Sequence, residues 1–286
     1  MIFFLLVFGA VIWSFLNVVS LRYDPDRFLF GPALFGRSHC PHCGATLRWF
    51  ELVPILSFAA QLGRCRRCRA RLSFRYPIVE ILSGFIFVFV PMRLSDPSFL
   101  LSLRSGFPLV AGLWILAFLL LLLMSLIDLR LSIIPDEINL LLFGIGIALV
   151  LASRPDFSAT GGSFLGAYGF LFGFRENIWL NHLVLGALAA GLFFWALMVI
   201  TRGRGMGAGD LKLAMPLGFL FGWPDILFVV GLAFVAGSIL GACAIGSGLK
   251  TLKSLVPFGP FLAASAAIVF FFGYQLVHWY FTLFGL

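Results

Sequence analysis

Four cysteines fall in two closely spaced pairs within one short stretch of the chain. Each pair has the form Cys-x-x-Cys, and 21 residues separate the first pair from the second. A two-residue gap lets both thiolates of a pair reach one tetrahedral ion at about 2.3 Å, and a second pair completes a four-coordinate site. The spacing therefore predicts a structural zinc site with Cys40, Cys43, Cys65 and Cys68 as ligands. Two disulfides, thioredoxin-like redox chemistry and unligated thiols are the alternatives.

Three aspartates stand where apolar segments begin or end. Asp128 closes one such segment, Asp136 opens the next, and Asp210 precedes a third. Two carboxylates that share a proton can hydrolyse a peptide, because the ionised one takes a proton from water while the protonated one polarises the scissile carbonyl. A helix cap or an arginine partner is the alternative for either acid alone. Asp225, which follows Pro224, is expected to be the N-cap of a later helix.

Glycines surround the third aspartate. Gly205, Gly207 and Gly209 alternate with small or apolar residues directly before Asp210. Glycine permits close backbone approach or a positive φ at such a position. The run matches neither a dinucleotide fingerprint nor a P-loop, and the chain has no G-x-S-x-G or H-E-x-x-H motif, which disfavours serine and zinc-metallopeptidase chemistry.

The elements that carry these residues are predicted to be membrane helices. The chain has 286 residues, 61% of them hydrophobic, and its 12 acidic and 20 basic residues are too few to cover a water-soluble protein of this size. We expect an all-α polytopic membrane protein of about eight transmembrane helices. The expected spans are residues 2–20, 77–93, 109–127, 138–152, 181–200, 211–223, 225–246 and 258–283, the sixth of them interrupted by Pro216 and Pro224.

The domain organisation follows from these spans. Residues 1–20 are expected to be the first transmembrane helix, since no basic residue precedes Arg22 and no cleavage site follows the apolar run. Residues 21–76 form an arginine-rich, four-cysteine insert between the first two helices. Residues 77–286 form the remaining membrane domain.

The basic residues predict the orientation of the helices. Sixteen Lys and Arg fall in residues 21–76, 128–137, 201–212 and 247–257, and only four fall in the intervening loops. Positive loops stay in the cytoplasm, so both termini are expected outside and the four-cysteine insert inside. The net charge of +8 is thus a topology signal with some attraction to anionic membrane lipid, and no nucleic-acid partner is expected.

Taken together, these motifs resemble the type IV prepilin peptidases, which belong to the G-x-G-D membrane aspartyl proteases. The resemblance runs nearly end to end. It covers residues 14–19, 37–43, 51–54, 75–80, 127–136, 206–212 and 257–260. It implies that Asp128 and Asp210 are the catalytic pair, that Asp136, Gly207, Gly209 and Lys212 support them, and that the four cysteines mark a bifunctional enzyme.

The resemblance also implies a function. Such enzymes cut the short basic leader from prepilins and pseudopilins at the cytoplasmic face of the bacterial inner membrane. They then methylate the new N-terminal amine with S-adenosylmethionine. The gap between Asp128 and Asp210 is longer than is usual in the family, and the extra residues fall in an expected external loop, 153–180. A related intramembrane aspartyl peptidase with another substrate, and a non-enzymatic adaptor or transporter that docks through its zinc unit, are the competing hypotheses.

Overall fold

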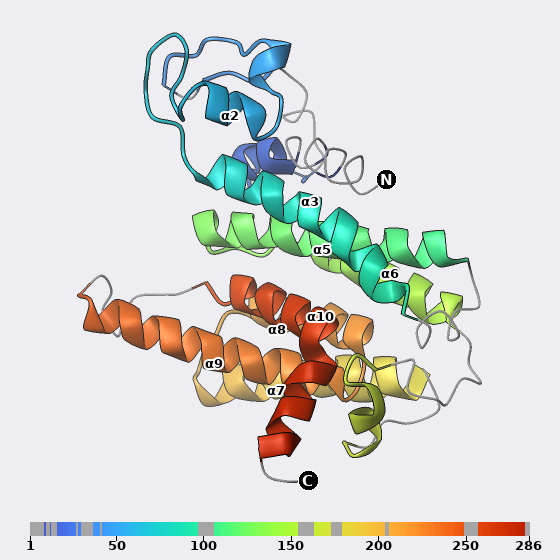
Figure 1. The fold of residues 1–286 in the computed structure, drawn as a ribbon. Coiled ribbons are helices and arrows are strands. Elements are labelled where there is room, and N and C mark those ends of the chain that lie inside the picture. Colours follow the sequence, from blue (N-terminus) through green and yellow to red (C-terminus); the bar gives the residue numbers. More distant parts are fainter. Residues whose placement is uncertain are drawn as a thin grey trace. The chain divides into compact units, whose positions relative to one another are not determined.

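The chain folds into helices, which confirms the expected fold class (Figure 1). The computed structural model describes Gly9, Ile12 and residues 16–26, 28–29, 37–40, 42–96, 106–153, 163–172, 179–203, 206–248 and 257–283. Within those residues the only β-type pairings are two isolated bridges. The chain divides into two compact units, Met1–Arg93 and Leu94–Leu286. Besides the helical residues 16–22, the described part of the chain contains the helices η2 (Trp49–Glu51), α2 (Leu56–Ala60), α3 (Arg75–Leu94), α5 (Phe107–Leu131), α6 (Asp136–Ala152), η3 (Gly166–Phe170), η4 (Leu180–Leu188), α7 (Ala189–Ile200), α8 (Ala208–Phe221), α9 (Asp225–Gly246) and α10 (Gly259–Leu283).

Five helical segments of the described chain are long and apolar enough to cross a membrane. They are α3, α5, η4 with α7, α9 and α10, and they coincide within a few residues with five of the expected spans. Helices α6 and α8 match two further expected spans but have only 17 and 14 residues. The expected first span, 2–20, lies mostly outside the described residues. The count of eight spans therefore stays a prediction.

Helix α8 corrects the expectation that its two prolines interrupt the sixth span. Pro216 lies inside α8, which continues without a break to Phe221. Proline removes only one N–H from the helical ladder, and packing on both sides can offset that loss. The helix ends instead at Gly222, whose φ of +70° leaves the right-handed helical region, and Pro224 then precedes α9.

Small residues and aromatic rings pack the second unit. Gly186 of η4 and Gly218 of α8 face each other so closely that a Cβ on either would overlap the backbone of the other. Such close approach is how small residues hold membrane helices together. The ring of Trp114 in α5 lies 4.9 to 5.5 Å from those of Phe164, Phe221 and Phe270, of which Phe221 belongs to α8. The last turn of α8 thus packs against both η4 and the aromatic cluster around Trp114.

Asp225 is not the helix cap that the sequence predicts. Its side chain makes no capping bond at the start of α9. Instead the buried carboxylate accepts hydrogen bonds from the Ser163 hydroxyl at 2.7 Å and from the Phe164 N–H at 2.9 Å. A carboxylate removed from water needs such donors, and the nearest ones lie in the loop that leads to η3. Asp225 therefore ties part of the long loop between α6 and η4 to the helical bundle.

We expect this tie to contribute measurably to stability. Replacing Asp225 with Ala leaves the buried Ser163 hydroxyl and Phe164 N–H without their acceptor. The free energy of unfolding should fall by about 1 to 3 kcal/mol. Ser163→Ala removes one bond and leaves the Phe164 N–H in place, so its effect should be about 1 kcal/mol. Thermal unfolding of purified protein in detergent measures both changes. Ser247→Ala, an exposed serine at the end of α9, is the control, and equal stability of all three variants would contradict the assignment.

Candidate active site and metal centre

The four cysteines of the first unit converge on one point. Their sulfur atoms all lie within 4.8 Å of one another, and none of them is in a disulfide. The Sγ atoms of Cys40 and Cys68 are 3.9 Å apart. A tetrahedron with metal–sulfur bonds of about 2.3 Å has edges of about 3.8 Å, so this separation is the one that a shared ion requires. The cluster therefore fits one tetrahedral metal ion.

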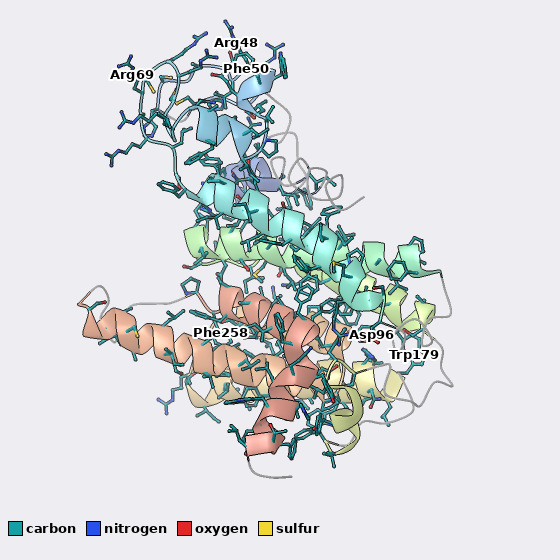
Figure 2. The ribbon with its side chains drawn as sticks, viewed as in Figure 1. Arg48, Phe50, Arg69, Asp96, Trp179 and Phe258 are labelled. Atoms are coloured by element: carbon teal, nitrogen blue, oxygen red, sulfur yellow. The ribbon has the colours of Figure 1, made fainter. Side chains whose placement is uncertain are left out.

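Both cysteine pairs use the same turn. The N–H of Cys40 binds the carbonyl of Ala45, and the N–H of Cys65 binds the carbonyl of Ala70, each at 2.9 Å. The residue after each pair has a left-handed backbone, with φ of +66° at Gly44 and +56° at Arg69. This repeated turn brings the two sulfurs of each pair to the same side of the backbone. Figure 2 shows Arg69 and Arg48 among the basic side chains that surround this part of the chain.

The protonation of the thiols suits metal binding. The backbone N–H groups of Cys68 and Arg67 lower the pKa of Cys65 from 9.0 to about 7. The N–H of Ala70 lowers the pKa of Cys68, but burial and the neighbouring thiols raise it, with a net value of about 11. Cysteines bind metal ions as thiolates, so metal binding at this cluster would release protons.

The four-cysteine segment is attached to α3 by a buried carboxylate. Glu80, in the second turn of α3, accepts a hydrogen bond of 2.7 Å from the backbone N–H of Ile55. Ile55 has a φ of +61°, an uncommon conformation for a β-branched residue. The Glu80 bond helps to hold this backbone in place. The structure thus gives a physical reason for the acid in the Arg75–Glu80 motif.

Asp128 lies in the last turn of α5. Ser132 ends the helix with a φ of +54°, and its N–H binds the carbonyl of Asp128 at 2.8 Å. The side chain of Asp128 is only 4% exposed, and one of its oxygens, Oδ2, accepts a hydrogen bond of 3.1 Å from the backbone N–H of Gly259. Gly259 is the first residue of α10, so two segments 131 residues apart in sequence meet at this carboxylate.

Asp210 lies in the first turn of α8. Gly207 is the N-cap, and its N–H points to Oδ2 of Asp210 at 3.4 Å, a weak bond. Burial, and secondarily the charge of Asp128, raise the pKa of Asp210 from 3.8 to about 6. The two carboxyl groups therefore lie within electrostatic reach of each other. Asp210 keeps its proton about two pH units higher than an unperturbed aspartate does.

Asp136 and Lys212 form an ion pair beside this site. The ammonium group of Lys212 lies 2.8 Å from both carboxylate oxygens of Asp136, which links the start of α6 to α8. Both side chains are more than half exposed, at 54% and 69%. Exposed pairs of this kind contribute less than about 1 kcal/mol. The pair aligns two helices without being a major source of stability.

Neither described glycine directly before Asp210 has the positive φ that was one of the two expectations, and Gly205 lies outside the described residues. Gly207 has a φ of −83°, and Gly209 lies within α8. The other expectation, close backbone approach, is not met at Gly207 or Gly209 either: a Cβ at Gly209 would lie 3.5 Å from the side chain of Ile134, and one at Gly207 would lie 3.9 Å from the nitrogen of Gly209, both ordinary contacts. Gly209 lies in the first turn of α8, where the helix requires right-handed backbone angles.

Two residues near the aspartates were missed from the sequence. Gly259 had a signal, since it stands between Phe258 and Pro260 at the start of the last helix, but its contact with Asp128 did not follow from that. Asn139 of α6 is buried, and neither atom of its amide has a hydrogen-bond partner in the described part of the chain. A polar residue one turn inside an apolar helix was the available signal for it.

Family models match two parts of the chain. Residues 7–94 match the bacterial peptidase A24 N-terminal domain, and residues 115–242 match the type IV leader peptidase family. The first match contains the four cysteines, and the second contains Asp128, Asp136 and Asp210.

Curated relatives match almost the whole chain. A prepilin leader peptidase/N-methyltransferase of Burkholderia pseudomallei (strain 1026b) is 35% identical over 302 residues, which cover 94% of this chain and 85% of the relative. Proteins of the same name from Aeromonas hydrophila and Bacillus subtilis (strain 168) are 31% and 29% identical, covering 97% and 96% of this chain and 93% and 96% of the relatives. No solved structure gave a significant match.

Proposed function

Because this chain belongs to the type IV leader peptidase family, we propose that it cuts the leader from prepilins or pseudopilins, with Asp128 and Asp210 as its catalytic pair. The observation that carries the assignment is that Asp128 ends α5 and Asp210 starts α8, with the charge of Asp128 helping, after burial, to raise the pKa of Asp210. Both helix ends also carry the loops that the basic residues assign to the cytoplasm. The scissile bond of a membrane-anchored prepilin would lie at that face of the inner membrane.

The proposed hydrolysis needs no group beyond the two acids and water. The ionised aspartate takes a proton from water while the water oxygen bonds to the scissile carbonyl carbon, and the protonated aspartate gives its proton to the carbonyl oxygen. The resulting diol then loses a hydroxyl proton to the second aspartate. As the C–N bond breaks, the first aspartate passes its proton to the leaving amine. Both acids return to their starting states, and one water is consumed.

The second proposed activity is methylation of the new N-terminus. Relatives that match nearly the whole chain are named N-methyltransferases, and we propose S-adenosylmethionine as the methyl donor. The new amine would take the methyl group from the sulfonium, which becomes a neutral thioether, and would lose one proton. The metal proposed for the cysteine cluster is Zn²⁺, which four thiolates hold in a closed tetrahedral site of structural type.

The catalytic pair is tested by isosteric substitution. Asp128→Asn and Asp210→Asn should each lower the cleavage rate by about 10³-fold or more, because two acids that act as one unit fail together. Asp136→Asn breaks an exposed ion pair and should cost about fivefold or less. The neighbouring Glu137→Gln serves as the control. Mass spectrometry of a prepilin incubated with enzyme in detergent measures the rate. Normal cleavage by Asp128→Asn with none by Asp136→Asn would mean that the first aspartate is wrongly assigned.

The metal centre is tested by removing ligands from both pairs. Cys43→Ser with Cys68→Ser should lose zinc and unfold the four-cysteine segment locally, since metal binding supplies much of the folding free energy of such small units. Methyl transfer should be lost first, whereas leader cleavage, which needs no metal, should fall less. Elemental analysis and the mass of the product are read from one preparation. The division is refuted if the variant keeps one zinc per chain, or loses cleavage while it methylates a precut substrate normally.

The topology is tested by labelling single cysteines. In a chain otherwise freed of reactive thiols, cysteines at positions 98 and 158 should react with an impermeant reagent from the periplasm, and a cysteine at position 254 should not. The expectation rests on the basic residues, of which sixteen lie in the segments expected inside and four in the loops expected outside. Permeabilised cells, in which position 254 should react, provide the control. Labelling of position 254 in intact cells would overturn the eight-span arrangement and place the aspartates on the opposite face.

A further inference from the structure

Helix α10 begins directly against the carboxylate of Asp128. The first N–H groups of an α-helix have no partner within the helix and must find one elsewhere. In α10 the N–H groups of Phe261 and Leu262 bind the carbonyl of Phe258 at 3.0 and 3.2 Å. The N–H of Gly259 instead binds Oδ2 of Asp128 at 3.1 Å, in a buried contact. The start of α10 therefore donates to one particular oxygen of this aspartate.

Only glycine leaves room for this contact. A Cβ built on residue 259 would lie 2.7 Å from Oδ2 of Asp128 and 2.9 Å from the sulfur of Met124. Both distances are shorter than real Cβ contacts, so a side chain at this position must displace the carboxylate, the thioether or both. The residue on the N-terminal side is itself anchored, because the ring of Phe258 lies 5.0 Å from that of Phe234 and 6.1 Å from that of Phe194. The backbone at 259 thus has little freedom to retreat.

From this geometry we propose that Gly259 is a positioning residue that selects which oxygen of Asp128 does the chemistry. An N–H can only donate, so Oδ2 acts as an acceptor and Oδ1 is the oxygen that gains and loses the proton. The inference rests on the proposed function, in which Asp128 exchanges a proton during hydrolysis. Among the described residues, the bond that Asp210 accepts from the N–H of Gly207 is weaker, at 3.4 Å. Gly259 thereby fixes the orientation of Asp128, and the more weakly held carboxyl group of Asp210 can adjust to it.

Gly259→Ala tests the proposal through kinetics. The added methyl group should turn the carboxylate of Asp128 out of its place and lower kcat for prepilin cleavage about hundredfold, as expected for a misplacement of about 1 Å. KM should stay within about twofold, because Gly259 is buried and the expected effect is on the orientation of Asp128. Methylation of a precut substrate by the same preparation should be unchanged, which shows that the variant is folded.

Two matched glycine variants separate positioning from packing. Gly144→Ala places a methyl group in open space in α6 and should leave kcat unchanged. Gly273→Ala crowds α10 far along the helix, where its Cβ would lie 3.0 Å from the carbonyl oxygen of Phe164. It should destabilise the protein but lower kcat much less than Gly259→Ala does. A kcat for Gly259→Ala equal to that of Gly273→Ala would overturn the positioning role.

A stability cycle tests the contact without any assay of activity. Gly259→Ala should lower the melting temperature of the otherwise unaltered chain more than it lowers that of an Asp128→Ala chain, in which the crowded carboxylate is absent. Equal shifts in the two backgrounds overturn the contact and the inference with it. If the shifts differ but the unaltered protein cleaves no prepilin, the contact is real and the proposed function is wrong, and with it the catalytic role of the contact. Unequal shifts together with the loss of kcat support both.

Discussion

Burial of a carboxylate at the end of an apolar helix constrains the structure around the candidate active site. Such a group costs several kcal/mol unless donors replace the lost water. In this chain the donors come mainly from backbone N–H groups of distant segments: Gly259 donates to Asp128, and Phe164 donates to Asp225. Each donor must come within hydrogen-bond distance, so each buried acid also fixes where another segment begins. The position of α10 against α5 is one result.

The second aspartate depends on a different kind of constraint. Asp210 is carried by the first turn of α8, and that helix is held by shape more than by polar bonds. The close approach of Gly186 and Gly218 joins α8 to η4, and the ring of Phe219 packs with Val150 and Ala187. Interdigitated packing of this kind leaves a helix few alternative positions. The carboxyl group is thereby brought within electrostatic reach of Asp128 even though no hydrogen bond joins the two side chains in the described structure.

The four-cysteine segment follows a third principle. It is too small to bury a large apolar core, and two copies of one tight turn direct its four sulfurs at a common point. A metal ion can take the place of such a core in small folded units. The buried Glu80 then ties the segment to α3 through the N–H of Ile55. The contact between Glu80 and Ile55 thus joins a local metal-binding fold to an apolar helix.

The sequence by itself determined what depends on local composition and spacing. Apolar runs predicted the helices of the bundle within a few residues, and the two Cys-x-x-Cys pairs predicted a four-sulfur cluster, because a two-residue gap is a short-range geometric property. Pairings between distant residues were decided only by the tertiary structure. The partner of Asp225 lies 61 residues away and that of Asp128 lies 131 residues away. Neither follows from sequence spacing, because which N–H meets a buried carboxylate depends on how the helices pack. For the same reason, only the tertiary structure shows that position 259 must be glycine, because a side chain there would collide with the carboxylate of Asp128.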